Sequence, residues 1–452
     1  MEENAIVLKR HIDSFLADWK NNDNRRPLIV KGARQIGKTY SILEFAKKNY
    51  ANVYEINFIL QPEYANIFSD GYDVDKIIKN LTLISPGFNF NPGETLLFFD
   101  EIQSVPSVAT SLKSFAIDGR YDVICSGSLM GINYREIESN SVGYKEDYEM
   151  FSLDFEEYLW AQGFTESMIG DIYDDLINVR PLSKTRYDVL SGHFRDYMIL
   201  GGMPAVVRNY MANGNFAGSL AIQRQLLLDY EEDITKYAEG FDKGRILSVY
   251  RHITTFLAKE NKKFQVSKLG KSARNRDYLG VIEWLACAGI VNPCYMLLVP
   301  ELPLKGNYDS SSYKLYYQDT GLLVASLDEE AQYDLRMNRN FNTYKGALYE
   351  NVVADMLRKA GYGLYYYKNP KSTVEMDFFI RDAESLIPVE VKADDGAGKS
   401  LVKMTSGKYP DIRYGIKLCN RNIGFNGQFY TIPYFLTFML RRFLRERNLP
   451  RE

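Results

Sequence analysis

The chain has 452 residues, of which 46% are hydrophobic and 25% are charged, and its formal net charge at pH 7 is −3. This balance is typical of a folded globular protein and excludes a mostly disordered chain, a collagen-like chain and a coiled-coil rod. At roughly 100–200 residues per domain, the length predicts about three domains.

Cysteine and histidine are too sparse for several kinds of site. The four cysteines form no CxxC pair, and the three histidines lie far apart in the sequence. This excludes the usual zinc templates and argues against a Ser-His-Asp triad. No apolar run approaches the ~20 residues of a membrane span, and the N-terminus lacks the apolar core of a signal peptide. We therefore expect a cytoplasmic protein with reduced thiols and no membrane association.

Charge is unevenly distributed along the chain. From Leu335 to the end there are 20 Lys and Arg against 12 Asp and Glu, a net charge of +8, which leaves −11 for the remainder. A basic C-terminal part favours a polyanionic partner such as DNA or RNA. Ordinary variation of surface residues can produce the same asymmetry.

The first part of the chain alternates strand and helix patterns. Apolar runs predict strands at 27–32, 95–101 and 121–128, and an alternating segment predicts one at 52–58, with helical spacing at 38–49 and 105–118 between them. Strands that are apolar on both faces indicate a parallel sheet covered by helices on both sides. We expect an α/β domain over residues 1–155.

A phosphate-binding motif follows the first of these strands. The segment GARQIGKT fits G-x-x-x-x-G-K-[ST], with a strand before it and a helix after it. Glycines let the backbone wrap around phosphates, while Lys38 reaches the β- and γ-phosphates and Thr39 ligates Mg²⁺. We therefore expect ATP and Mg²⁺ to bind at the loop Gly32, Ala33, Arg34, Gln35, Ile36, Gly37, Lys38 and Thr39.

Two acids end the strand at 95–101. Ligands of open α/β sheets bind at the carboxyl ends of the strands, so Asp100 is expected to support the metal and Glu101 to activate the attacking water. The next strand ends in Ser126 and Ser128. Either serine could contact the γ-phosphate or the water, and a plain turn role for both is the alternative.

The middle part, residues 156–335, is mainly helical in pattern. Within it, about 245–325, a short helix, a turn, a longer helix and two strand-like pieces predict a winged helix-turn-helix. Basic side chains that could contact phosphates flank the turn, whereas the alternative is a packing or lid module. These side chains are Lys268, Lys271, Arg274 and Arg276.

Several segments together resemble a bacterial family of AAA+ ATPases that is related to archaeal-type ATPases. They are GARQIGKT, FFDEIQ, CSGS and SLDFEEYL, joined by YMILGGMPAVV, YKLYYQDTGLL and YKGALYENVV, so the resemblance covers nearly the whole chain. It implies an ATPase whose serines lie at the sensor position and whose C-terminal half, a domain of unknown function, has a restriction-endonuclease-like core. Many members carry a Gly-Arg pair before the SLDFEEYL-like segment. Here Tyr144 and Lys145 stand there, and Lys145 could substitute in part for an arginine finger, although its point charge lacks the bidentate fork of arginine.

The last part, residues 336–452, carries a loose nuclease-like signature. Glu350 lies in an expected helix, Asp377 in the strand VEMDFFI, and Glu390 and Lys392 two residues apart on a strand, hence on one face. Such acids can bind a divalent metal, and the lysine can stabilise charge, as in the PD-(D/E)xK pattern, with Met376-Asp377 in place of the proline-acid step. We expect Glu350, Asp377 and Glu390 as metal ligands. The alternative is a nuclease-like domain that binds without cutting.

The sequence therefore predicts a Mg²⁺-dependent P-loop ATPase that couples nucleotide binding or hydrolysis to nucleic-acid engagement, with phosphodiester cleavage as a further step. The competing interpretation is a nucleotide-dependent switch whose C-terminal domain binds a protein partner. The tyrosine run at 365–367 is expected to be a packed strand rather than a base-stacking surface.

Overall fold

The computed structural model describes residues 6–128, 141–238, 242–259, 262–270, 273–337, 345–392 and 398–447. The chain divides into two compact units. The smaller unit comprises Lys9–Ser152 with Cys287–Gly289, and the larger unit takes the other residues from Leu153 onward. The middle and C-terminal parts, which the sequence divided near residue 335, thus pack together as one unit.

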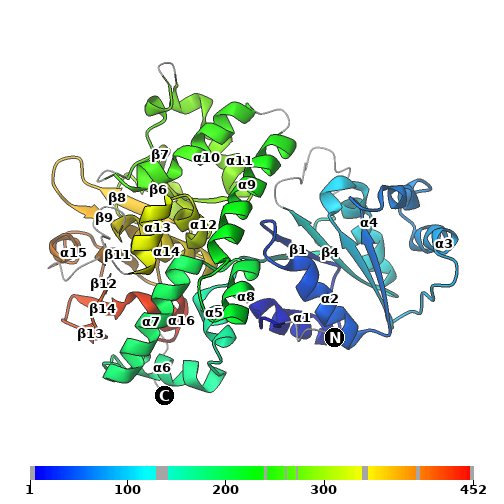
Figure 1. Cartoon of the computed structure of the whole chain (residues 1–452), viewed down its shortest axis with the longest axis horizontal. Helices are drawn as coiled ribbons and strands as arrows, with labels where there is room; N and C mark the ends of the chain where they lie inside the picture. Colours follow the sequence, from blue (N-terminus) through cyan, green and yellow to red (C-terminus); the bar gives the residue numbers. More distant parts are fainter. Residues whose placement is uncertain are drawn as a thin grey trace. The chain divides into compact units, whose positions relative to one another are not determined.

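The smaller unit is built on a five-stranded sheet in the order β2-β3-β4-β1-β5, in which every pairing is parallel. Helix α2 contacts β1 and β4, and α4 also contacts β4 (Figure 1). Its elements are α1 (His11–Asn21), β1 (Leu28–Gly32), α2 (Lys38–Asn49), β2 (Asn52–Asn57), α3 (Val74–Ile84), β3 (Thr95–Asp100), α4 (Ser107–Asp118), β4 (Asp122–Ser128) and β5 (Glu146–Glu149).

The sheet of the smaller unit is covered on both sides because its central strands are hydrophobic on both faces. All six residues of β3 are buried, as are six of the seven in β4. The parallel α/β fold expected from the apolar runs is therefore confirmed, and its four expected strands lie within a residue or two of their expected bounds. Strand β5 was not predicted, because its sequence EDYE is polar and no residue in it is buried.

The larger unit begins with helices. The first starts at Asp154, whose carboxylate accepts from the backbone N of Glu157 at 2.8 Å, while Glu157 Oε2 accepts from the backbone N of Asp154 at 3.0 Å. This reciprocal capping box satisfies two otherwise unpaired N–H groups and explains why the helix begins there. The helices are α5 (Phe155–Ala161), α6 (Glu166–Ile177), α7 (Lys184–Leu200), α8 (Pro204–Asn213), α9 (Ser219–Tyr237), α10 (Lys243–Leu257) and α11 (Leu279–Cys287).

Two mixed sheets complete the larger unit. One has the order β7-β6-β8-β9 and the other β10-β11-β12-β14-β13. Their strands are β6 (Val291–Leu297), β7 (Tyr308–Tyr317), β8 (Tyr365–Lys368), β9 (Glu375–Met376), β10 (Phe378–Arg381), β11 (Leu386–Lys392), β12 (Gly415–Cys419), β13 (Gly424–Phe425) and β14 (Phe429–Pro433). The remaining helices are α12 (Thr320–Ala325), α13 (Glu329–Arg336), α14 (Lys345–Lys359), α15 (Lys399–Met404) and α16 (Leu440–Arg447).

The segment expected to form a winged helix-turn-helix differs from that pattern. In place of the expected short helix near 263–270, the structure has a single 3-10 turn at Val266–Lys268. The hairpin β6–β7 does exist, but β6 also pairs in parallel with β8, so the expected wing is part of a larger sheet. Lys268, Arg274 and Arg276 lie along this segment, whereas Lys271 falls outside the described residues.

No helix in the described part of the chain is both long and apolar enough to cross a bilayer.

Candidate functional site

The loop between β1 and α2 has the backbone that its glycines require. Gly37, immediately before α2, has φ 93°, in the left-handed region that glycine adopts without strain. A Cβ on Gly32 would collide with the carbonyl oxygen of Met150, so no other residue fits there. Gln35 also has a positive φ of 64°. The tight loop expected from GARQIGKT is therefore present.

Lys38 lies folded into this loop. Its Nζ donates to the carbonyl oxygens of Ala33 at 2.7 Å and Gly32 at 3.2 Å. Burial lowers the pKa of Lys38 to about 8, against the opposite effect of the Glu101 and Asp100 carboxylates. The loop thus holds a positive charge that has lost most of its water, the arrangement that a phosphate would stabilise.

Asp100 is the centre of a hydrogen-bond network at the carboxyl end of β3. Its carboxylate accepts from Thr39 Oγ1 at 3.1 Å, from Asn57 Nδ2 at 3.1 Å, and from the hydroxyl of Ser126. Thr39 and Asp100 supply the hydroxyl and carboxylate oxygens that Mg²⁺ prefers, so the donor set fits this ion. The sequence did not show which of Ser126 and Ser128 contacts the site. In the structure, the Ser126 side chain is hydrogen-bonded to Asp100.

Glu101 lies beside this network in an unusual conformation. Its φ is 58°, in the left-handed region, and its carboxylate accepts from the side-chain amide of Gln103. The other end of that amide accepts from the backbone N of Ser128 at 3.2 Å. Gln103 therefore links the expected catalytic acid to the end of β4. Backbone strain of this kind is common where a side chain must be held in a fixed position, which agrees with the role expected for Glu101.

Three residues that the sequence analysis did not single out support this site: Asn57, Gln103 and Arg10. The guanidinium of Arg10 donates to the carbonyl oxygens of Ile36 at 2.9 Å and Phe151 at 2.7 Å, which fixes the middle of the phosphate loop. Asn57 could have been found as the polar residue that ends β2. No local pattern points to Arg10, because it lies 26 residues away from Ile36.

Lys145, which stands where the related family has an arginine, is engaged elsewhere. Its Nζ lies 2.6 Å from Asp147 Oδ2, and Lys31 Nζ lies 3.1 Å from the other oxygen of the same carboxylate. Asp147 is on the edge strand β5. In this arrangement Lys145 forms part of a surface ion-pair cluster.

In the C-terminal part, the acids expected to bind a metal lie close to lysine side chains. Glu350 is bound by Lys262 and by the hydroxyl of Tyr316 at 3.0 Å, and the buried Lys314 lies 3.6 Å from Glu350 and 4.0 Å from Asp377. Burial disfavours ionisation of both acids, but Lys314 and Lys262 hold the pKa of Glu350 below its usual range. For Asp377, burial and the charge of Glu350 prevail, and its pKa is raised. Lysine ammonium groups therefore balance this acidic cluster.

Glu390 and Lys392 lie on the same face of β11, as their spacing requires, with Lys392 Nζ 3.0 Å from Glu390 Oε1. Pairing of Phe378 with Val389 places Asp377 next to Glu390 in register, and Asp377 accepts from the backbone N of Val391 at 2.8 Å. The signature residues thus converge at neighbouring strand positions. Among the described residues, however, no group of three or more His, Cys, Asp or Glu is arranged to hold a metal ion.

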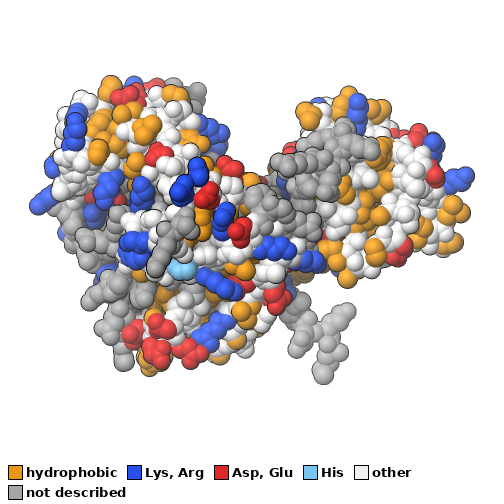
Figure 2. Space-filling view, turned by 90° about the horizontal axis from the view of Figure 1, so that it is seen from above, with side chains coloured by type: hydrophobic (Ala, Val, Ile, Leu, Met, Phe, Trp, Pro, Cys, Tyr) orange, Lys and Arg blue, Asp and Glu red, His pale blue; other side chains and the backbone are white. Residues whose placement is uncertain are grey.

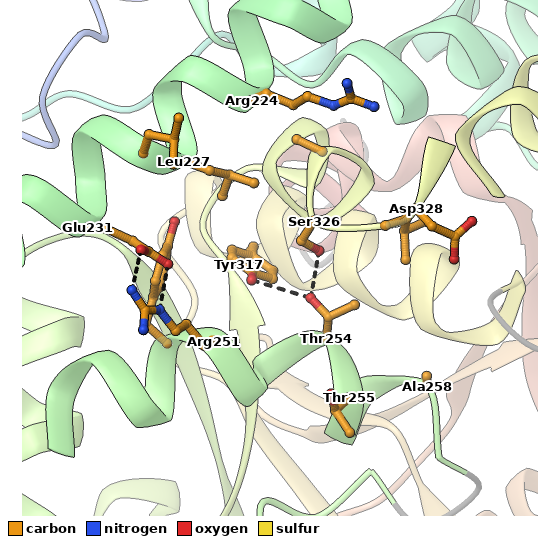
Figure 3. A pocket seen from close by; sticks show the side chains of 14 residues that line it. Arg224, Leu227, Glu231, Arg251, Thr254, Thr255, Ala258, Tyr317, Ser326 and Asp328 are labelled. Atoms are coloured by element: carbon orange, nitrogen blue, oxygen red, sulfur yellow. Dashed lines mark hydrogen bonds and ion pairs between the residues drawn. The ribbon is translucent and has the colours of Figure 1, made fainter. Parts of the chain in front are cut away.

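A pocket of about 690 Å³ lies in the larger unit between α9, α10 and the turn after α12. Figure 3 shows Thr254 between Tyr317 and Ser326, with hydroxyl oxygens at 3.3 and 2.6 Å, and Arg251 paired with Glu231. Acids and bases pair with one another along its wall. In this wall Arg251 pairs with Glu231, and Arg224 pairs with Glu329.

The uneven distribution of charge along the sequence was the reason to expect a nucleic-acid partner. On the face shown in Figure 2, the Lys and Arg side chains of the larger unit (left) are interspersed with Asp and Glu rather than gathered in one broad field. The tyrosine run at 365–367 is buried in β8, as expected for a packed strand. On this face, a polyanion would therefore meet basic side chains only in small groups.

Three family models match separate stretches of the chain. An AAA domain model matches residues 24–159, a domain of unknown function (DUF8612) matches residues 191–333, and a second domain of unknown function (DUF4143) matches residues 345–436. A comparison with curated protein sequences finds no match.

Several solved structures are similar at low identity. A Walker-type ATPase of Pyrococcus abyssi has 14% identity and a TM-score of 0.44, covering 71% of this chain and 96% of its own. The ORC2 protein of Aeropyrum pernix in its ADP form has 12% identity and a TM-score of 0.30, covering 74% and 94%. The RuvB Holliday junction branch migration motor of Thermotoga maritima has 12% identity and a TM-score of 0.29, covering 73% and 93%.

The AAA-domain match over residues 24–159 and the parallel sheet support a P-loop domain of the AAA+ class in the smaller unit. Domains of this class use a nucleotide and usually Mg²⁺, which agrees with the donor set around Lys38, Thr39 and Asp100.

Proposed function

We propose that this protein binds and hydrolyses ATP at the loop Gly32–Thr39. The observation that carries the proposal is the contact of 3.1 Å between Thr39 Oγ1 and Asp100, beside the buried ammonium of Lys38. A hydroxyl, a carboxylate and a desolvated cation at the carboxyl end of a parallel sheet fit a Mg²⁺–nucleotide.

Each residue has a separate role in this proposal. Lys38 attracts the phosphates, Thr39 and Asp100 hold the Mg²⁺, and Glu101 accepts the proton of the attacking water. When bound, Mg²⁺ neutralises charge that develops on the phosphate oxygens. Asn57 and Ser126 keep the Asp100 carboxylate in place.

Two substitutions separate binding from turnover. Lys38→Ala should abolish tight ATP binding, because it removes charge from the phosphates in both the ground and the transition state. Glu101→Gln should retain binding and lower turnover by about 10²–10⁴-fold, because it removes only the base. Isothermal titration and phosphate release measure the two effects, with the exposed Glu63→Gln as the matched control. Equal turnover by Glu101→Gln and the parent would contradict the assignment.

We further propose that the nucleotide state of the smaller unit regulates nucleic-acid binding by the larger unit. The support is the net charge of +8 from Leu335 onward, together with basic side chains that line a pocket in the same part of the chain. Binding of labelled DNA and RNA with and without ATP tests this proposal, and no binding at low salt would refute it.

Metal-dependent phosphodiester cleavage is a second candidate. Its support is the convergence of Asp377 with Glu390 and Lys392, while the contacts of Lys314 with Glu350 and Asp377 weigh against it. Cleavage at this site requires a divalent metal to replace a lysine ammonium as the partner of Asp377. Nicking of DNA or RNA with Mg²⁺ or Mn²⁺ that is lost in both Asp377→Ala and Glu390→Ala would establish it.

A further inference from the structure

A second pocket in the larger unit, of about 620 Å³, is lined by basic side chains from separate segments. They are Lys305 from the turn at Leu304–Gly306, Arg381 from the end of β10, and Arg441 and Arg445 from α16. Arg441 and Arg445 are four residues apart, so they share one face of the helix.

Asp382 is the single acid among the described residues that line this pocket, and its carboxylate is engaged within the fold. One oxygen accepts from the backbone N of Ser385 at 2.6 Å and of Glu384 at 2.9 Å, and the other accepts from Tyr414 Oη at 2.7 Å. The residue is also buried. Asp382 therefore stabilises a turn rather than neutralising the arginines.

Two of the cations are held in place by the backbone. Arg381 donates to the carbonyl oxygens of Asp382 at 3.1 Å and Ala383 at 3.2 Å. Arg441 donates to the carbonyl oxygen of Ala360, and its guanidinium lies 5.6 Å from the centre of the Tyr362 ring. Because a guanidinium has five N–H donors, both arginines keep donors for a ligand while their positions are fixed.

The other two cations, Lys305 and Arg445, are exposed and have no ion-pair partner among the described residues. Burial raises the pKa of the Tyr362 phenol to about 12, the charges of Arg441 and Arg445 act in the opposite direction, and the charge of Asp382 acts with burial. Both guanidinium groups are thus close enough to Tyr362 for their fields to act on one phenol. The pocket therefore holds four basic side chains against one lining acid, Asp382, whose carboxylate is engaged in its own turn.

We propose that this pocket binds the phosphate groups of a nucleic-acid strand. Arginine donors in fixed positions match phosphate oxygens, and a pocket of this size accommodates a nucleotide. This inference rests on the proposed function, to which it adds the place of contact.

Charge reversal with a matched control tests the inference. Lys305→Glu combined with Arg445→Glu changes two exposed residues in the pocket. Lys399→Glu combined with Lys403→Glu makes the same change in net charge on the exposed face of α15 in the same unit. Thermal melting should show that both double variants stay folded, because all four side chains are exposed.

Fluorescence anisotropy on the full chain, with single- and double-stranded DNA and RNA oligonucleotides, gives the readout. The pocket variant should bind about tenfold or more weakly than the control, since charged hydrogen bonds are removed. Its slope of log affinity against log salt should fall by about 0.7 for each phosphate of a single strand that the protein no longer neutralises. Equal affinity and slope for the two double variants would overturn the pocket assignment. Absence of binding by the parent would instead refute the nucleic-acid part of the proposed function.

Discussion

At the scale of single residues, the state of Lys38 makes ATP binding depend on pH. Burial lowers its pKa to about 8, so near pH 8 a fraction of the free protein has lost this proton. Bound phosphates would favour the ammonium form, and binding should therefore take up protons around pH 8 and weaken as the pH rises further. Isothermal titration in buffers of different ionisation enthalpy measures this uptake.

Lys38→Arg is the control for that measurement. A guanidinium stays charged throughout this pH range, so the variant should bind ATP with no proton uptake at this position. Equal uptake by the parent and by Lys38→Arg would show that another group is responsible.

The residues of the site could be predicted from the sequence only in part. Lys38, Thr39 and Asp100 belong to motifs whose spacing is fixed by the strand-loop-helix geometry, and they meet as that geometry requires. Arg10 could not be found, because its contacts with the loop depend on how α1 packs against a distant segment. Lys314 was missed for the same reason, since it stands in β7 within an apolar run and meets Glu350 only in the folded unit.

At the scale of elements, Asn351 in α14 connects parts of the chain that the sequence pattern treats as separate. Its side chain accepts from the backbone N of Tyr317 at 2.8 Å and donates to Thr320 Oγ1 at 3.1 Å and to the carbonyl oxygen of Tyr317 at 3.3 Å. Asn351 is fully buried. This one amide fixes the end of β7 and the start of α12 against α14.

Asn351→Ala should therefore destabilise the larger unit by about 2–4 kcal/mol, because it leaves buried backbone groups without partners and opens a cavity. Urea unfolding measures the decrease in the free energy of unfolding. The exposed Lys403→Ala, in the same unit, should stay within about 0.5 kcal/mol of the parent. A similarly small effect of Asn351→Ala would mean that the amide is not a structural link.

The difference from the expected winged helix-turn-helix has a physical cause. Periodicity identifies a local face, and it correctly predicted α14 and β11, but it cannot show which strands pair. Strand β6 pairs with β8 across a separation of about 70 residues, so the hairpin expected as a wing lies inside a sheet. The same pairing joins the middle and C-terminal parts, which the sequence pattern treats as separate.

At the scale of the whole molecule, the proposed coupling between nucleotide and nucleic acid has a thermodynamic consequence. If ATP changes the affinity for an oligonucleotide by some factor, the oligonucleotide must change the affinity for ATP by the same factor. Factors of about 5–150 are typical of such coupling. Glu101→Gln is the variant of choice, because it should hold ATP without consuming it during either titration.

The two titrations should therefore give matching factors in Glu101→Gln, measured by anisotropy for the oligonucleotide and by calorimetry for ATP. Lys38→Ala should bind the oligonucleotide with the same affinity whether or not ATP is present, because this variant does not bind the ATP that would change that affinity. Unequal factors would show that the two ligands compete or act at additional sites. Identical oligonucleotide affinity in Glu101→Gln with and without saturating ATP would show that the two units work independently, and the coupling proposal would be wrong even if each unit binds its own ligand.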